Sequence, residues 1–383
     1  MKNIRKDFNL ANKITYLDNA ALVLKPNVAI EASNDFYMNY SVSTRTSDSP
    51  LGIKMAQTID EVRNKIAKLV DAKEDEVLFT SGTTDSLNKI ALMLKPLINK
   101  DDEILLSAYN HSSNFAPWIE IANECGAKIV VAEDLISKIN SKTKIVAYAQ
   151  MNNSFNVKID PNLLYKTAKK FDAIVINDAA QAISYEKVSL TNCDVIAFSA
   201  NKLYGPTGLG ALVIKDSLLK QLKPSTFGGG AVAEINNQNH LTLQCGIKMF
   251  EPGTQNLAGI YMFNKSLDYF MNELNYADIQ AYLKSLSNYA YKELSKVPNI
   301  KIYSEPNDHI ILFNIKNINS QDVAHYLGMH DVYVRAGVFC AQYLKNFKND
   351  YSFVRISLAP YNNKEDIDKL TKLLKEGGDF LVL

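Results

Sequence analysis

The strongest constraint on the fold is a regular alternation of short apolar runs with amphipathic helical segments between residues 77 and 215. The runs are VLFT at 77, EILLS at 103, KIVVA at 128, KIVAYAQ at 144, AIVIN at 173, DVIAFS at 194 and ALVIK at 211. Segments such as SSNFAPWIEIANECG and PNLLYKTAKKF lie between them. This pattern predicts an α/β domain with a large, mostly parallel sheet, helices on both faces and functional loops at the carboxyl ends of the strands.

The C-terminal part of the chain has a different texture. Two long helical patterns cover 256–274 and 277–297, and the strand patterns HIILFNI, VYVR and FVRISL follow before a closing helical pattern at 363–378. We therefore expect a large α/β domain over residues 16–255 and a smaller α+β domain formed by residues 1–15 and 256–383. A chain of 383 residues that is 47% hydrophobic is long enough to bury both cores.

Charge and composition exclude several classes of protein. The formal net charge is +1 and no block of like charge stands out, which argues against nucleic acid as a partner. The start, MKNIRKDFNLANK, lacks the apolar stretch of a secretion signal, and no apolar run is long enough to span a bilayer, so we expect a cytoplasmic protein without a membrane partner. The four cysteines form no C-x-x-C pair, and no metal-ligand spacing is present.

Polar residues follow several of the predicted strands. The small-residue turn SGTT at 81–84 opens directly into a helical pattern, which suits a phosphate but equally fits an ordinary N-capped loop. His111 follows the strand at 103, and Asp178 ends the strand at 173, where a buried carboxylate needs a cationic partner. Lys202 follows the strand at 194 inside the stretch AFSANKLYGPTGLGAL. Taken alone, Lys202 is most simply read as a surface lysine in a turn.

Together these residues match the needs of one cofactor. Pyridoxal 5'-phosphate (PLP) requires a lysine that can form an imine, an anion for its pyridinium nitrogen, a phosphate cradle and a group that stacks on its ring. Lys202, Asp178, Thr84 and His111 fit these four roles in that order. The ordered set therefore favours a PLP site over a chance surface lysine.

The sequence resembles the class V, fold type I PLP enzymes, and within them the SufS-type (group II) cysteine desulfurases. The resemblance runs nearly from end to end. Its motifs are YLDNAA at 16, FTSGTTDSLN at 79, NHSSNFAPW at 110, NDAAQA at 177, FSANKLYGPTGLGAL at 198, FGGGAV at 227, FEPGTQN at 250, VRAGVFCAQ at 334 and FVRISLAPYNNKEDID at 353. It implies the fold of the PLP-dependent transferases of fold type I.

The resemblance also implies a role for each matching residue. Lys202 would be the Schiff-base lysine, His111 the stacking ring and Asp178 the partner of the pyridine nitrogen. The cofactor's remaining contacts would come from Gln181 and Asn153 near the ring oxygen, from Thr83, Thr84, Ser199 and Asn201 near the phosphate, and from Thr254 of a neighbouring subunit. A homodimer is therefore expected. Arg355 would bind the substrate carboxylate, and Arg335 and Asn153 are also expected to contact the substrate.

Cys340 decides the expected reaction. It lies five positions after Arg335 and fifteen before Arg355, and it occupies the nucleophile position of the family's matching loop. The expected activity is conversion of L-cysteine to L-alanine, with a persulfide on Cys340 that passes to an acceptor protein of the SufE-like or SufU-like kind, for iron–sulfur cluster assembly or another thiolation route. The other cysteines, Cys125, Cys193 and Cys245, are expected to be small buried hydrophobes.

Some positions depart from the family's pattern. Val338 and Phe339 stand where many relatives have histidines, Asn201 where a histidine is usual and Asn156 where a glycine is common. Selenocysteine lyase, cysteine sulfinate desulfinase, an aminotransferase or epimerase, and a scaffold without catalysis stay open as alternatives. The polar stretch STRTSDSPLG around Arg45 fits a segment that covers the active site and equally fits a solvated loop.

Overall fold

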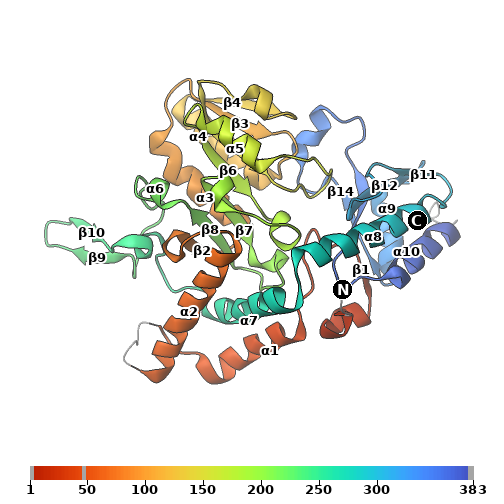
Figure 1. Cartoon of the computed structure of the whole chain (residues 1–383), viewed down its shortest axis with the longest axis horizontal. Coiled ribbons are helices and arrows are strands. Elements are labelled where there is room, and N and C mark those ends of the chain that lie inside the picture. Colours follow the sequence, from red (N-terminus) through yellow and green to blue (C-terminus); the bar gives the residue numbers. More distant parts are fainter. Residues whose placement is uncertain (1–3, 45–48, 378–383) are drawn as a thin grey trace.

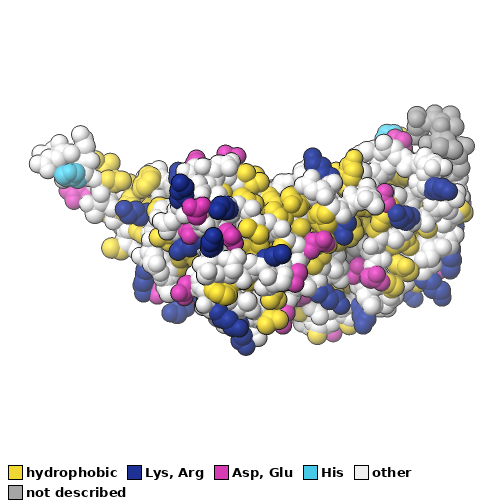
Figure 2. Space-filling model, turned by 90° about the horizontal axis from the view of Figure 1, so that it is seen from above, with side chains coloured by type: hydrophobic (Ala, Val, Ile, Leu, Met, Phe, Trp, Pro, Cys, Tyr) yellow, Lys and Arg dark blue, Asp and Glu magenta, His cyan; other side chains and the backbone are white. Residues whose placement is uncertain are grey.

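The structure is a computed structural model that describes residues 4–44 and 49–377 (Figure 1). Arg45, considered above as part of a covering segment, lies outside the described residues. A large unit and a smaller unit lie side by side, and a two-stranded hairpin extends away from the large unit (Figures 1 and 2). This hairpin is formed by β9 (Val232–Ile235) and β10 (Leu241–Leu243).

The large unit is built on a seven-stranded sheet with the strand order β2-β8-β7-β6-β5-β3-β4. From β4 to β7 all neighbouring strands are parallel, whereas β8 is antiparallel to both β7 and β2, so the predicted mostly parallel sheet is confirmed. The strands are β2 (Val77–Thr80), β3 (Glu103–Ser107), β4 (Lys128–Ala132), β5 (Thr143–Ala149), β6 (Ile174–Asp178), β7 (Val195–Ser199) and β8 (Gly210–Ile214). The segment between β7 and β8 is too short for a crossover, and β8 therefore returns antiparallel.

Alternate residues of each strand face opposite sides of the sheet, so helices cover both sides. On β3, Ile104 and Leu106 pack in one core cluster and Leu105 in the other. The first cluster contains residues of α3 (Thr83–Leu94), α4 (Ala116–Cys125) and α6 (Asp216–Leu219). The second contains residues of α2 (Pro50–Leu69), α5 (Pro161–Lys169) and α7 (Leu257–Glu273). Burial on both sides explains why these strands are continuous apolar runs.

The smaller unit contains a four-stranded antiparallel sheet with the order β11-β12-β15-β14. Its elements are α8 (Tyr276–Leu294), β11 (Ile300–Ile302), β12 (Ile310–Ile315), α9 (Ser320–Met329), β14 (Arg335–Gly337), β15 (Phe353–Ser357) and α10 (Lys364–Glu376). α7 packs against α1 (Asn27–Asp35) and α2, which belong to the large unit. The predicted boundary between residues 255 and 256 stays a prediction.

The expected single strand VYVR is divided in the structure. β13 (Val332–Tyr333) pairs in parallel with β1 (Thr15–Tyr16), and β14 pairs antiparallel with β15. The chain changes partners at Val334, because the N-terminal segment supplies a second strand for this stretch. Within the described part of the chain, no helix combines the length and the apolar character needed to cross a bilayer.

A buried ion pair fixes the segment after the hairpin to the large sheet. Arg63 on α2 donates hydrogen bonds to both carboxylate oxygens of Glu251 at 3.0 and 2.8 Å and to the carbonyl of Val77. The backbone N–H of Phe79 donates to the same carboxylate at 2.6 Å. Both charged side chains are only 8% exposed. Removing one partner of such a pair leaves a buried charge without compensation.

We expect Glu251→Gln to lower the free energy of unfolding by about 3 kcal/mol, because Arg63 would keep its charge in a buried site. Urea unfolding followed by circular dichroism measures this loss. The matched control is Asp101→Asn, which neutralises the Lys128–Asp101 pair at 3.1 Å, where the side chains are 58% and 61% exposed. The control should leave the midpoint unchanged, and an equal loss in both variants would contradict the assigned importance of the buried pair.

Candidate active site

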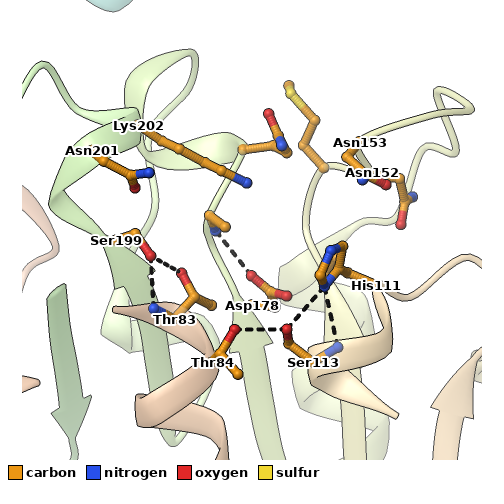
Figure 3. Close-up of a pocket in the computed structure, with 14 residues that line it drawn as sticks. Thr83, Thr84, His111, Ser113, Asn152, Asn153, Asp178, Ser199, Asn201 and Lys202 are labelled. Atoms are coloured by element: carbon orange, nitrogen blue, oxygen red, sulfur yellow. Dashed lines mark hydrogen bonds between the residues drawn. The ribbon is translucent and has the colours of Figure 1, made fainter. Parts of the chain in front are cut away.

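The carboxyl ends of β2, β3, β5, β6 and β7 meet at one edge of the large sheet, where they surround a cavity of about 170 Å³. Of the predicted site residues, nine line this cavity: Thr83, Thr84, His111, Asn153, Asp178, Gln181, Ser199, Asn201 and Lys202. Figure 3 shows Lys202 and His111 pointing into it from opposite sides, with Asp178 between them. The sequence argument that strand ends converge here is therefore supported by the geometry.

Lys202 ends a short 3₁₀ helix, Ala200–Lys202, that directly follows β7. This turn is closed by hydrogen bonds from the Ala200 N–H to the Leu209 carbonyl and from the Gly205 N–H to the Ala200 carbonyl, both 2.9 Å long. Burial lowers the pKa of Lys202 to about 8, although the Asp178 carboxylate opposes this shift. The amine is thus neutral in about a tenth of the molecules at pH 7, far more than for an unperturbed lysine.

Asp178 ends β6 and is 4% exposed. Its carboxylate accepts a hydrogen bond of 3.0 Å from the Ala180 N–H. Burial raises the pKa of Asp178, and the Ala180 hydrogen bond and the Lys202 charge oppose that rise. A cationic group bound in the cavity would give this carboxylate the compensation that burial otherwise denies it.

His111 faces the cavity as a neutral ring. Its Nδ1 accepts a hydrogen bond of 3.1 Å from the Ser113 N–H and lies 3.0 Å from the Ser113 hydroxyl. Burial and the nearby Lys202 charge lower the pKa of His111 to about 4. The ring is therefore uncharged at neutral pH and presents a flat aromatic face.

Several hydroxyl groups gather at the first turn of α3. The Thr83 N–H donates to the Ser199 hydroxyl at 2.7 Å, and the two hydroxyls lie 2.8 Å apart. Gly82, which precedes the helix, has a φ of 148°, and a Cβ there would lie 3.1 Å from the Ser199 hydroxyl. The Thr84 hydroxyl is 2.8 Å from that of Ser113. Hydroxyls and a helix N-terminus at one end of the cavity suit a phosphate.

Arg355 and Cys340 do not line the cavity but are connected to it through Asn153 and Ser112. Arg355 is buried and donates to the Asn153 carbonyl at 2.8 Å, while the Asn153 amide donates to the Phe339 carbonyl at 2.8 Å. The N–H and the hydroxyl of Ser112, next to His111, both donate to the Cys340 carbonyl at 2.7 Å. The cysteine loop is therefore fixed at the rim of the cavity.

The cysteines differ in exposure. Cys340 is exposed and Cys193 is buried, and Cys125 is partly buried. Cys245 is exposed, so the expectation that it is a buried hydrophobe is wrong, because it follows the β9–β10 hairpin instead of lying in either core. Among the described residues, no group of three or more His, Cys, Asp or Glu side chains is placed so that it could hold a metal ion.

Other predicted roles stay predictions. Gln181 lines the cavity, but its amide donates to the Ala20 carbonyl at 2.7 Å. Thr254 is exposed and does not line the cavity, so its contact with a neighbouring subunit is untested. The Arg335 side chain is 48% exposed.

Sequence reasoning also missed three residues of the site. Ser113 and Asn152 line the cavity, and Asp18 pairs with Arg355 at 2.7 Å. Ser113 and Asp18 both belong to family motifs quoted above, and their presence in those motifs could have identified them as site residues.

Comparisons with known proteins identify the family of this chain. Residues 15–370 match the profile of the family Aminotransferase class-V. A probable cysteine desulfurase of Ureaplasma parvum is 36% identical, over 95% of this chain and 93% of its own length. Another from Mycoplasma genitalium is 35% identical, over 100% of this chain and 96% of its own. The crystal structure of the cysteine desulfurase CsdA from Escherichia coli superposes with a TM-score of 0.90 at 29% identity, covering 97% of both chains. The chain therefore belongs to the class-V aminotransferases, a PLP-dependent family, and within it to the cysteine desulfurases.

Proposed function

We propose that this protein is a PLP-dependent cysteine desulfurase. It converts L-cysteine to L-alanine and holds the released sulfur as a persulfide on Cys340. The observation that carries this proposal is the placement of Cys340: its carbonyl is held by Ser112, the neighbour of the cavity residue His111, while the cysteine itself is exposed. A nucleophile is thus fixed beside a cavity that contains a lysine and a carboxylate.

The residues present fit PLP. The cavity offers an amine with a lowered pKa, a buried carboxylate, a neutral ring and a phosphate cradle, each described above. In addition, the amide oxygens of Asn153 and Asn201 are buried and have no hydrogen-bond partner among the described residues. Buried polar atoms of this kind are expected where a polar ligand binds. When bound, PLP withdraws electrons from the substrate carbon that carries the amino group, so that bonds next to it can be broken.

The side chains then have separate tasks. Lys202 would hold the cofactor through its side-chain amine. The same amine would accept the Cα proton of the substrate, a role that suits an amine with a pKa of about 8. Asp178 would stabilise positive charge on the ring nitrogen of the cofactor. His111 would pack against that ring without adding charge. Arg355 binds the substrate carboxylate, for which a guanidinium has the right geometry.

The sulfur step balances without an added oxidant or reductant. The Cys340 thiolate attacks the substrate sulfur, an S–S bond forms and the substrate C–S bond breaks. The electron pair of the broken bond stays on the substrate carbon, which takes up a proton to become the methyl group of alanine. Lys202 then returns a proton to Cα, which completes the alanine. Since Cys340 is exposed, an acceptor protein of the SufE-like or SufU-like kind can reach the persulfide and pass its sulfur to cluster assembly or another thiolation route. We propose that the enzyme works in the cytoplasm as a homodimer to which Thr254 contributes across the interface.

The first test compares Cys340→Ser with the matched exposed control Cys245→Ser, both loaded with PLP and given L-cysteine without reductant. We expect the Cys340 variant to keep the visible absorbance of the bound cofactor but to gain no sulfur, because it lacks the attacking thiolate. The control should gain one sulfur on the peptide that contains residue 340. Intact-protein and peptide mass spectrometry, with alanine quantified, provides the readout.

Undiminished sulfur uptake in the Cys340 variant would contradict its role. A loaded cofactor with a keto acid or an inverted amino acid as the product would instead favour an aminotransferase or an epimerase.

The lowered pKa of Lys202 gives a pH prediction for cofactor attachment to the apoprotein. Only the neutral amine reacts, so the rate should rise about tenfold per pH unit below pH 8 and level off above it, whereas an unperturbed lysine would keep rising to about pH 10.4. Stopped-flow absorbance between pH 6 and 10 measures this. Asp178→Asn should move the midpoint to lower pH, because the carboxylate that raises the Lys202 pKa is gone. A rate still rising at pH 10 would show that Lys202 is not desolvated.

A further inference from the structure

Ser113 contacts one edge of the His111 ring twice. Its backbone N–H donates to Nδ1 at 3.1 Å, and its hydroxyl lies 3.0 Å from the same nitrogen. Figure 3 shows both contacts at this edge of the ring. A backbone N–H can only donate, so Nδ1 accepts, and the single proton of the neutral ring is on Nε2.

The local fold explains these contacts. His111 caps the 3₁₀ helix Ser112–Asn114, and Ser113 lies in the middle of that helix. The Ser113 hydroxyl also lies 2.8 Å from the hydroxyl of Thr84, on the first turn of α3. All three side chains line the cavity. Ser113 therefore connects the His111 ring to the end of the cavity where the hydroxyls suit a phosphate.

The number of protons available to these contacts is fixed. The Nδ1 atom of His111, the Ser113 oxygen and the Thr84 oxygen form two contacts, and the two hydroxyls supply two protons. Distances of 2.8 and 3.0 Å leave no room for a water between the atoms, so each contact needs a proton of its own. In the free protein, Thr84 therefore donates to Ser113, and Ser113 donates to Nδ1.

A bound phosphate adds a third contact but no proton. A phosphate oxygen that accepts from Thr84 forms a charge-assisted hydrogen bond, which is stronger than a bond between neutral groups. The Thr84 oxygen must then accept from Ser113, whose hydroxyl no longer donates to Nδ1. Because Nδ1 keeps the Ser113 N–H, this is the contact whose loss costs least.

We propose that Ser113 is a positioning residue that fixes His111 in the tautomer protonated on Nε2 and couples this ring to the phosphate site through one hydroxyl proton. In the free protein this proton lies between Ser113 and His111. In the protein with bound phosphate it lies between Ser113 and Thr84. The inference rests on the proposed function, in which Thr84 contacts the phosphate of PLP and His111 packs against the ring.

The test is nitrogen-15 NMR of the histidine side chains at neutral pH, with His111→Gln used to assign the His111 signals. It compares the free protein, the protein with PLP and the protein with pyridoxal, which has the same ring but no phosphate. In the wild type we expect a protonated Nε2 in all three states. The Nδ1 resonance should lie at higher frequency with PLP than with pyridoxal, because Nδ1 accepts one hydrogen bond fewer.

Ser113→Ala removes the hydroxyl and keeps the backbone N–H. In this variant the free protein should already have the Nδ1 resonance at higher frequency than the free wild type, and the difference between PLP and pyridoxal should be lost. Ser113→Thr, which keeps a hydroxyl, should retain that difference. The matched control is Ser112→Ala, because the Ser112 hydroxyl donates to the Cys340 carbonyl instead, and it should also retain the difference.

Two results would overturn the proposal. One is a proton on Nδ1 in the wild-type protein, and the other is an equal difference between PLP and pyridoxal in the wild type and in Ser113→Ala. If Ser113→Ala does not fold, the absence of any difference in the wild type overturns the proposal.

Failure of the proposed function has a different signature. In that case the wild-type protein would not take up PLP or would not convert L-cysteine to alanine, while the free wild type and the free Ser113→Ala protein still show whether the hydroxyl donates to Nδ1. Normal conversion of cysteine together with an Nδ1 resonance that does not depend on Ser113 would reject this inference alone.

Discussion

The short return from β7 to β8 is the constraint on which the site depends. Only ten residues, 200–209, connect the two strands at the edge of the sheet, and Lys202 is one of them. Close packing fixes its path. A Cβ on Gly205 would overlap the ring of Phe263 on α7, and one on Gly210 would lie 2.6 Å from the Cα of Gly82. Only glycine allows these approaches, so one connection brings the lysine, the α3 N-terminus and α7 together.

Burial then gives this edge its chemistry. Desolvation opposes charge on Lys202, Asp178 and His111 alike, which lowers the pKa of the two bases and raises the pKa of the acid. The amine and the carboxylate partly compensate each other, since each favours the charged form of the other. A bound group with its own positive charge would stabilise the negative charge of Asp178 in place of Lys202. Lys202 could then stay neutral. The same burial that costs stability in the free protein thus prepares the amine to react.

The sequence predicts the convergent part of this arrangement well. Parallel strands end at one edge, so residues such as His111, Asp178 and Lys202 could be placed together from their position after apolar runs. Contacts between distant segments could not be found in this way. Asp18 and Arg355 are 337 positions apart, and the division of the expected strand at Val334 depends on pairing with the N-terminal segment. No local sequence pattern predicts the contact between Asp18 and Arg355 or the division of the strand. The role of Thr254 depends on a second chain and is a prediction for the same reason.

The cysteine loop shows how a departure from the family's pattern is accommodated. Phe339 and Cys340 both have left-handed backbone conformations, with φ of 56° and 57°, which non-glycine residues adopt only when their surroundings hold them. Hydrogen bonds stabilise these conformations: the Asn153 amide donates to the carbonyl of the first residue, and the Ser112 hydroxyl donates to the carbonyl of the second. Phe339 is buried, and the Arg355 guanidinium lies 4.6 Å from the centre of its ring. A histidine in this place would face the cost of charging beside a buried cation, whereas phenylalanine packs there without titrating. Position 339 therefore supplies no proton, and protons for the sulfur step must come from solvent at the exposed Cys340 or from groups inside the cavity.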